Sequence, residues 1–353
     1  MAFKEYSKNM SFLDMELARI LGVSRTQKLL AEINKHIDWR PIEEILVKGY
    51  PVGKSSVGNA AYPPLMLLKA LLLQKWFGIK SDPELENQLN DRISFRIFIG
   101  LPFSDMAPDH SVICRFRDRV GDKTVAAVHN ALLRQFKALG FSLESGMAVD
   151  ARLIKSASHP VSSEKLEELK EDKEEKTDTS VKFSRDIESD WTIKNDEPHF
   201  GMKEHASIDV ESGLVLSTLI SKASEHDTNY FQAVIIKSLH GDSLPSRVYA
   251  DKGYCSGLNR VFLNDNNIAD GIMRKNLINA RLTDFEIQRN KLISKVRYKI
   301  EQYFGLTELH QGAGKARFTT LAKQGWDNLC GVMAFNIKRV TLVMQKQPVP
   351  MTI

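Results

Sequence analysis

Three acidic residues stand where a carboxylate group could carry out chemistry. Asp150 lies within or at the end of an expected strand in "SGMAVDARLIKS". Asp251 ends a second expected strand in "RVYADKGY", at the edge where α/β sheets place their sites. Glu301 lies within an expected helix in "RYKIEQYF", where neighbouring aromatic residues indicate partial burial. A charge at the end of a buried strand is costly unless something compensates it.

Metal binding would explain these three acids together. Carboxylates that share a small volume raise one another's pKa values, and a divalent cation removes that conflict. Hard oxygen ligands suit Mg²⁺ or Mn²⁺, and two such ions roughly 3.5–4 Å apart can activate water and stabilise the leaving oxygen in phosphoryl transfer. Arg297 lies one helical turn before Glu301, and its planar guanidinium suits phosphate oxygens. The alternative for each acid alone is a helix N-cap or half of an ion pair.

The elements that would hold these acids alternate between strands and helices after Gly140. The strand with Asp150 is followed by a hairpin whose turn spans 209–213, then by a helix and the strand that ends at Asp251. A short helix, another strand and a long helical pattern from about 282 to 305 complete the series. This order predicts a mixed α/β domain with helices on both faces of the sheet.

The first 140 residues have the pattern of helices. The segment 64–78 predicts a buried helix, begun by two prolines and ended by Gly78. The stretch "PDHSVICRFRDRVG" (108–121) places apolar residues on one helix face and Arg115 and Arg119 on another. Helix-turn-helix proteins read DNA with a short helix of this kind. The alternative is a solvated basic face that does not contact DNA.

Composition narrows the class of protein. A chain of 353 residues suggests two domains, and 42% hydrophobic residues supply a sizeable core. The net charge of +5 permits nucleic-acid binding without requiring it. Three cysteines without a CxxC pair argue against a disulfide framework or zinc site and fit a reducing cytoplasm. The most apolar stretch is too short to span a bilayer and contains lysines, so no membrane partner is expected.

The motifs, taken in order, resemble the DDE transposases of bacterial insertion sequences, most closely the insertion-sequence-five family. The resemblance runs from about Tyr62 to Arg339 and rests on "PDHSVICRFRDRV", "MAVDARLIKS", "HFGMKEHASIDVESGL" followed by "SEHD", "VYADKGY", "RYKIEQYFG", "GKARF" and "MAFNIKR". It implies a helical N-terminal DNA-binding domain at 1–140 and a ribonuclease-H-like catalytic domain at 141–345. That domain would be a mixed sheet flanked by helices, with a charged insert at about 157–198, and a tail at 346–353 would follow.

The resemblance also implies a function. Asp150, Asp251 and Glu301 correspond to the family's metal-binding triad, and Arg297 corresponds to its phosphate-contacting arginine. A transposase of this kind uses Mg²⁺, for which Mn²⁺ can substitute, to cut and transfer DNA strands. Its partners are double-stranded DNA, as inverted-repeat ends and as target, and further copies of itself on DNA. The expected location is the bacterial cytoplasm, in association with the nucleoid.

Two positions depart from the family's pattern. Ser294 stands where a tyrosine often precedes the arginine, and Glu308 stands where a lysine often follows the glutamate. Lys299 or Lys315 could take over the role of that lysine. Lys315 and Arg317, in "AGKARF", are either a phosphate clamp or an exposed basic turn. Two other functions stay open: a domesticated or inactive derivative that only binds DNA, and a nuclease on the same ribonuclease-H-like scaffold.

Two histidines in the matched motifs are also candidates for a general base. His205 and His226 lie near the expected sheet. Because metal-activated water does not need a protein base, structural roles are the simpler interpretation for both. Within the charged insert, "SRDIESDW" resembles a family motif, so this part of the insert is expected to be more than a linker.

Overall fold

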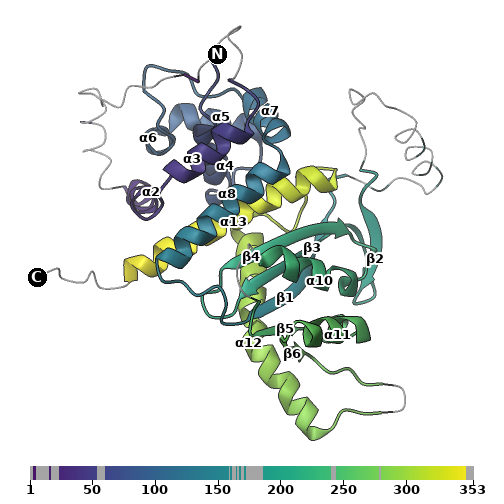
Figure 1. Ribbon diagram of the computed structural model, residues 1–353. Helices are drawn as coiled ribbons and strands as arrows, with labels where there is room; N and C mark the ends of the chain where they lie inside the picture. Colours follow the sequence, from purple (N-terminus) through teal and green to yellow (C-terminus); the bar gives the residue numbers. More distant parts are fainter. Residues whose placement is uncertain are drawn as a thin grey trace, which may run out of the picture. The chain divides into compact units, whose positions relative to one another are not determined.

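The computed structural model describes residues 3–4, 16, 24–53, 60–158, 160, 164, 167, 171, 186–239, 244–277 and 280–346. The chain forms two compact units (Figure 1). The first comprises Met1–Gly140 together with Leu329–Ile353, and the second comprises Phe141–Asn328. The expected tail lies outside the described residues, apart from Lys346.

The first unit consists of helices. Its elements are α2 (Arg25–His36), α3 (Arg40–Gly49), α4 (Pro64–Trp76), α5 (Asp82–Asp91), α6 (Ile93–Ile99), α7 (His110–Val120), α8 (Asp122–Ala138) and the C-terminal part of α13 (Leu321–Lys346). The predicted buried helix is confirmed as α4, which is buried on nearly all sides. The indole of Trp76 donates a 2.8 Å hydrogen bond to the carbonyl of Ala334, so α13 packs against α4. Helix α7 begins where Asp109 accepts a hydrogen bond from the Ser111 amide.

The second unit is built on a mixed six-stranded sheet. Its strands are β1 (Met147–Lys155), β2 (Asp190–Lys194), β3 (Glu197–Asp209), β4 (Val215–Lys222), β5 (Arg247–Ala250) and β6 (Ala269–Ile272). Their order is β2-β3-β1-β5-β6, with β4 also paired to β3. Strand β1 runs antiparallel to β3 and parallel to β5, and β5 runs parallel to β6. The predicted hairpin is confirmed as β3 and β4, and Asp209 accepts the amides of Glu211 and Ser212 in its turn.

Helices cover both faces of this sheet, as the alternating pattern predicted. They are α10 (Asp227–Ser238), the 3-10 helix η1 (Lys252–Tyr254), α11 (Gly257–Asp265) and α12 (Asp284–Gln311). On β3, Ser207 contacts Ser238 of α10, whereas Glu204 contacts Tyr303 of α12. Because residues an odd number apart on a strand point to opposite faces, α10 and α12 lie on opposite sides of the sheet (Figure 1).

One expected boundary was wrong. Helix α12 does not end near 305 but continues to Gln311, where Gly312 adopts a left-handed conformation with φ of 67°. Gly305 stays helical, because a single glycine costs a helix only about 1 kcal/mol. The charged insert contains strand β2, so the part of it around "SRDIESDW" is more than a linker, as expected. There Asp186 is buried and accepts hydrogen bonds from Ser156 and Ser189, which joins the insert to the end of β1. Most of 159–185 lies outside the described residues.

Candidate active site

The strand pairing places Asp150 and Asp251 next to each other. Asp150 lies in the middle of β1, which continues to Lys155. The parallel pairing between β1 and β5 ends at Val149 and Ala250, so each aspartate directly follows the last residue of its strand that takes part in this pairing. Asp251 then precedes the 3-10 turn of η1. Two residues that are 101 positions apart in the sequence (251 − 150) therefore lie next to each other where the β1–β5 pairing ends.

Arg297 of α12 bridges the two aspartates. One guanidinium nitrogen, Nη2, donates a 2.6 Å hydrogen bond to Oδ2 of Asp150. The other, Nη1, lies 3.8 Å from Oδ1 of Asp251. The arginine is only 6% exposed, and its Nε has no hydrogen-bond partner among the residues that the structure describes. The Nε–H of Arg297 is therefore a buried donor without a hydrogen bond in the described part of the chain.

Glu301 lies one helical turn after Arg297. Its carboxylate is exposed and makes no hydrogen bond or ion pair with the described part of the chain. Burial raises the pKa of Asp150, Arg297 and the Ala151 amide lower it, and the negative charges of Asp251 and Glu301 raise it again. Glu301 therefore acts electrostatically on the same site as the two aspartates.

The carboxylates of this site suit a divalent cation as ligands. Three carboxylates against one guanidinium leave the site with excess negative charge, and the carboxylates of Asp251 and Glu301 add to the rise in the pKa of Asp150 that burial mainly causes. Carboxylate oxygens are the hard ligands that Mg²⁺ prefers. The described residues form one cluster of three potential ligands within 4.8 Å, and it lies elsewhere, at Glu86, Asp109 and His110. The triad is more open than that cluster, with Arg297 between its aspartates.

Tyr254 was not singled out from the sequence, although it belongs to "RVYADKGY". Its side chain is buried, and its hydroxyl has no hydrogen-bond partner among the described residues. Burial raises the pKa of Tyr254 well above its ordinary value, and the negative charge of Asp150 raises it further. The hydroxyl stays protonated, so a second unused donor lies near the aspartates.

A second arginine–carboxylate pair on the same sheet was also missed. Arg152 is two residues after Asp150 and points to the same face of β1. Its Nε donates a 2.6 Å hydrogen bond to Oε2 of Glu204, and its Nη1 donates a 2.8 Å bond to Thr307 of α12. The alternation of strand residues could have indicated that Arg152 faces α12, but nothing local in the sequence identifies Glu204 as its partner.

Glu204 is completely buried and receives several donors. Its Oε1 accepts hydrogen bonds from Tyr303 at 2.7 Å, Asn328 at 2.9 Å and Thr218 at 3.3 Å. These donors come from α12, α13 and β4, so the network anchors two helices to the sheet. Because α12 also carries Arg297, this network helps to position the candidate active site.

His205 lies on the opposite face of β3 from Glu204. Its Nε2 is 2.8 Å from the hydroxyl of Ser221, and its ring stacks on Tyr230 with centroids 4.3 Å apart. Burial lowers the pKa of His205 to about 4, so the ring is neutral near pH 7. His226 is the N-cap residue of α10 and makes no side-chain cap hydrogen bond. The geometry brings neither histidine into the bridge between Arg297 and the aspartates.

Lys315 and Arg317 lie beside the far end of β1. The Lys155 amide donates to the Gly314 carbonyl at 2.9 Å, and the Ala316 amide donates to the Lys155 carbonyl at 2.8 Å. This bridge lies five residues beyond Asp150, or about 17 Å along an extended strand. Lys315 is exposed, whereas Arg317 is half-buried with Nη1 3.8 Å from Asp327. The structure therefore does not gather these two cations with the triad.

The two departures from the family's pattern lie on α12. Ser294 and Glu308 are both exposed. A Cβ atom added to Gly314 would lie 2.9 Å from Oε1 of Glu308, so Glu308 folds back toward the loop that follows its helix.

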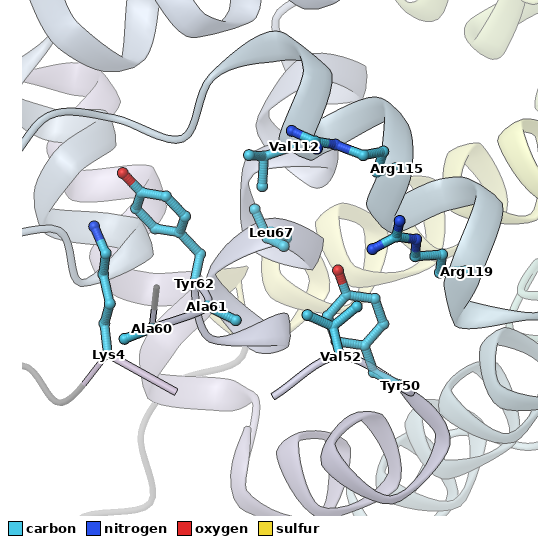
Figure 2. Close-up of a pocket in the computed structure, with 10 residues that line it drawn as sticks. All are labelled: Lys4, Tyr50, Val52, Ala60, Ala61, Tyr62, Leu67, Val112, Arg115 and Arg119. Carbon is cyan, nitrogen blue, oxygen red and sulfur yellow. The ribbon is translucent and has the colours of Figure 1, made fainter. Parts of the chain in front are cut away.

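Arg115 and Arg119 belong to the first unit. Both lie on α7 and line a pocket with two tyrosines (Figure 2). The guanidinium of Arg115 donates to the carbonyl of Ser111 at 3.0 Å and to its hydroxyl at 2.7 Å. Arg119 is exposed and has no hydrogen bond or ion pair with the residues described. Arg119 is therefore the freer of the two cations.

The mixed sheet with helices on both faces defines a ribonuclease-H-like fold. Residues 142–330 match the family model described as "Transposase DDE domain", and residues 21–119 match the model described as "Transposase domain (DUF772)". Because the first match covers more than half of the 353 residues, the chain belongs to the family of transposases with a DDE domain. These matches do not distinguish the insertion-sequence-five group. No solved structure gives a significant match. None of the described helices combines the length and apolarity needed to cross a membrane.

Proposed function

We propose that this protein binds the terminal inverted repeats of its own insertion sequence and catalyses metal-dependent strand cleavage and strand transfer. The observation that carries the proposal is the bridge from Arg297 to Asp150 and Asp251, with Glu301 one turn further along α12. Membership of the DDE transposase family supplies the reaction class, phosphoryl transfer on DNA.

Each residue of the candidate active site has its own proposed role. Asp150, Asp251 and Glu301 would hold Mg²⁺, for which Mn²⁺ can substitute, and the bound metal would supply activation of water and stabilisation of the leaving oxygen. Arg297 lies beside both aspartates, where its guanidinium would orient the scissile phosphate and offset the charge that develops on it. Attack of water on the phosphodiester frees a 3′-hydroxyl at the end of the element. Attack of that hydroxyl on a target phosphodiester joins the strand to target DNA.

DNA binding is assigned to both units. In the first unit, α7 presents Arg115 and Arg119 to the phosphates of the terminal repeats. In the second, exposed Lys315 is a candidate contact for more distant phosphates, and the ion pair of Arg317 with Asp327 favours a structural role for that arginine. Cutting two ends of one element calls for at least two copies of the chain on DNA. The bacterial nucleoid is the compartment in which such a protein would act.

The test uses the full chain and a duplex taken from the DNA that flanks its coding region. We expect Asp251→Asn to reduce cleavage by about 10³-fold, because the charge stabilisation that a bound metal supplies is worth several kcal/mol. Binding to the duplex should stay near the wild-type level, and chelation of divalent metal should abolish wild-type cleavage. Asp265→Asn, a change at an exposed acid of α11, is the matched control and should keep full activity.

Each alternative has its own outcome in this assay. A loss of binding as large as the loss of cleavage would mean that Asp251 has a structural role. Cleavage without joining of a pre-nicked end to target DNA would identify a nuclease. Binding without cleavage by the wild-type chain would identify an inactive derivative.

A further inference from the structure

The first unit contains a pocket of about 700 Å³ beside α7 (Figure 2). This volume falls within the range of roughly 300–1,000 Å³ that is typical of small-molecule sites. Segments far apart in the sequence contribute to it, namely the end of α3, the segment before α4, α4 itself and α7. The lining residues are Lys4, Tyr50, Val52, Ala60, Ala61, Tyr62, Leu67, Val112, Arg115 and Arg119.

Three cations lie at this pocket. Arg119 has no hydrogen bond or ion pair with the described residues, and Arg115 uses part of its guanidinium on Ser111. The ammonium of Lys4 lies 4.0 Å from the centre of the Tyr62 ring, where it gains a cation–π contact and keeps its hydrogen-bond donors. No acidic residue is among the lining residues, so the pocket favours an anion.

The remaining lining is apolar and aromatic. Tyr50 is buried with its ring packed edge-on against Phe116 at 5.2 Å, and burial raises the pKa of its hydroxyl while Arg119 opposes that rise. Tyr62 is fixed by a 3.2 Å hydrogen bond from its hydroxyl to the carbonyl of Met106. Aliphatic side chains complete the wall. A row of duplex phosphates needs only a cationic surface, whereas an apolar wall beside two rings fits a planar base.

We propose that this pocket receives one unpaired nucleotide of the element's terminal DNA, with its base against the apolar wall and its phosphate on Arg119 and Arg115. The proposal rests on the proposed function, because it assumes that the first unit binds the inverted repeats. Enzymes and binding proteins that extrude a base lose its pairing and stacking, and the cost is smallest where the base is already unpaired. The pocket therefore adds recognition of an extruded base to the phosphate contacts of α7.

The experiment replaces each base of the terminal duplex in turn with the fluorescent base 2-aminopurine and adds the full chain without divalent metal. Fluorescence should rise several-fold at one position, where the base leaves the stack, and stay low at the others. A mismatch or an abasic partner at that position should tighten binding, because the cost of unpairing is already removed.

Two variants connect this signal to the pocket. Val112→Phe should fill the apolar wall and remove the fluorescence rise, with most of the affinity retained and an unchanged melting temperature. Arg119→Ala should weaken binding and reduce the slope of log K against log salt by about 0.9, the value for one phosphate contact. Arg134→Ala removes the same charge from the exposed surface of α8, does not line the pocket, and should leave both readings unchanged.

The outcomes separate this inference from the function on which it rests. Normal binding and cleavage with no fluorescence rise at any position would overturn the pocket assignment and leave the transposase function standing. A rise that persists in both Val112→Phe and Arg119→Ala would place the extruded base elsewhere and would also overturn it. Failure of the wild-type chain to bind the terminal duplex would overturn both.

Discussion

Two arginine–carboxylate pairs occupy neighbouring positions on one face of β1, and they differ in how their charges are balanced. Arg152 and Glu204 form a buried network in which Glu204 also accepts hydrogen bonds from Tyr303, Asn328 and Thr218. The pair two residues earlier, Arg297 with Asp150, leaves the Nε of Arg297 without a partner among the described residues.

The two pairs differ in surplus negative charge. The single negative charge of Glu204 is balanced by one guanidinium, and several polar groups donate hydrogen bonds to it. At the other pair, one guanidinium faces Asp150 and Asp251, with Glu301 close enough to raise the pKa of Asp150. The balanced ion pair of Arg152 with Glu204 holds α12 on the sheet, whereas a site with surplus negative charge can bind a divalent cation. The same chemical pair thus has a structural role at one position and a proposed catalytic role at the other.

The largest effect is expected from the structural pair. Glu204→Gln should lower the free energy of unfolding by about 3–5 kcal/mol, because it leaves the buried guanidinium of Arg152 without its counter-charge. Chemical denaturation measures this change. Combining Glu204→Gln with Arg152→Met should recover much of the loss, since removal of the guanidinium leaves no uncompensated buried charge. A single variant as stable as the wild type would contradict the structural role.

The same substitution at both arginines sharpens the comparison. Arg297→Lys should reduce single-turnover cleavage of a pre-nicked end by about 10²–10³-fold, the usual cost of losing one preorganised donor, with little change in thermal melting. Arg152→Lys should instead lower the melting temperature, because one ammonium cannot span Glu204 and Thr307 as the guanidinium does. Near-normal cleavage by Arg297→Lys would remove that residue from the active site.

A smaller effect is expected from two buried tyrosines. Tyr303→Phe should cost about 1.5–3 kcal/mol of folding free energy, because its hydroxyl donates to a charged carboxylate. Tyr254→Phe should be nearly neutral for stability, because the hydroxyl it removes has no partner among the described residues. Parallel denaturation curves test both. Equal losses in the two variants would show that the hydroxyl of Tyr254 is paired after all, for instance through water.

Much of the fold could be predicted from local patterns. The hairpin of β3 and β4, the buried helix α4 and the alternation of strands with helices followed from hydrophobic period and from turn and cap residues. The end of α12 could not be predicted, because tertiary packing outweighs the small helix penalty of Gly305. Strand β2 was hidden within a charged segment, since it is an edge strand that buries little of its length.

For the candidate site, the sequence by itself determined the residue types, the position of Asp150 in a strand and of Asp251 at the end of another, and the one-turn spacing of Arg297 and Glu301. Only the tertiary structure decided that β1 pairs with β5, which brings the two aspartates together, and that Arg297 lies between them. Only the tertiary structure revealed the partner of Arg152 and the pocket at Arg119. The physical reason is that local patterns report which face of an element is buried. The burial and hydrogen bonding of the whole sheet determine which distant element covers that face.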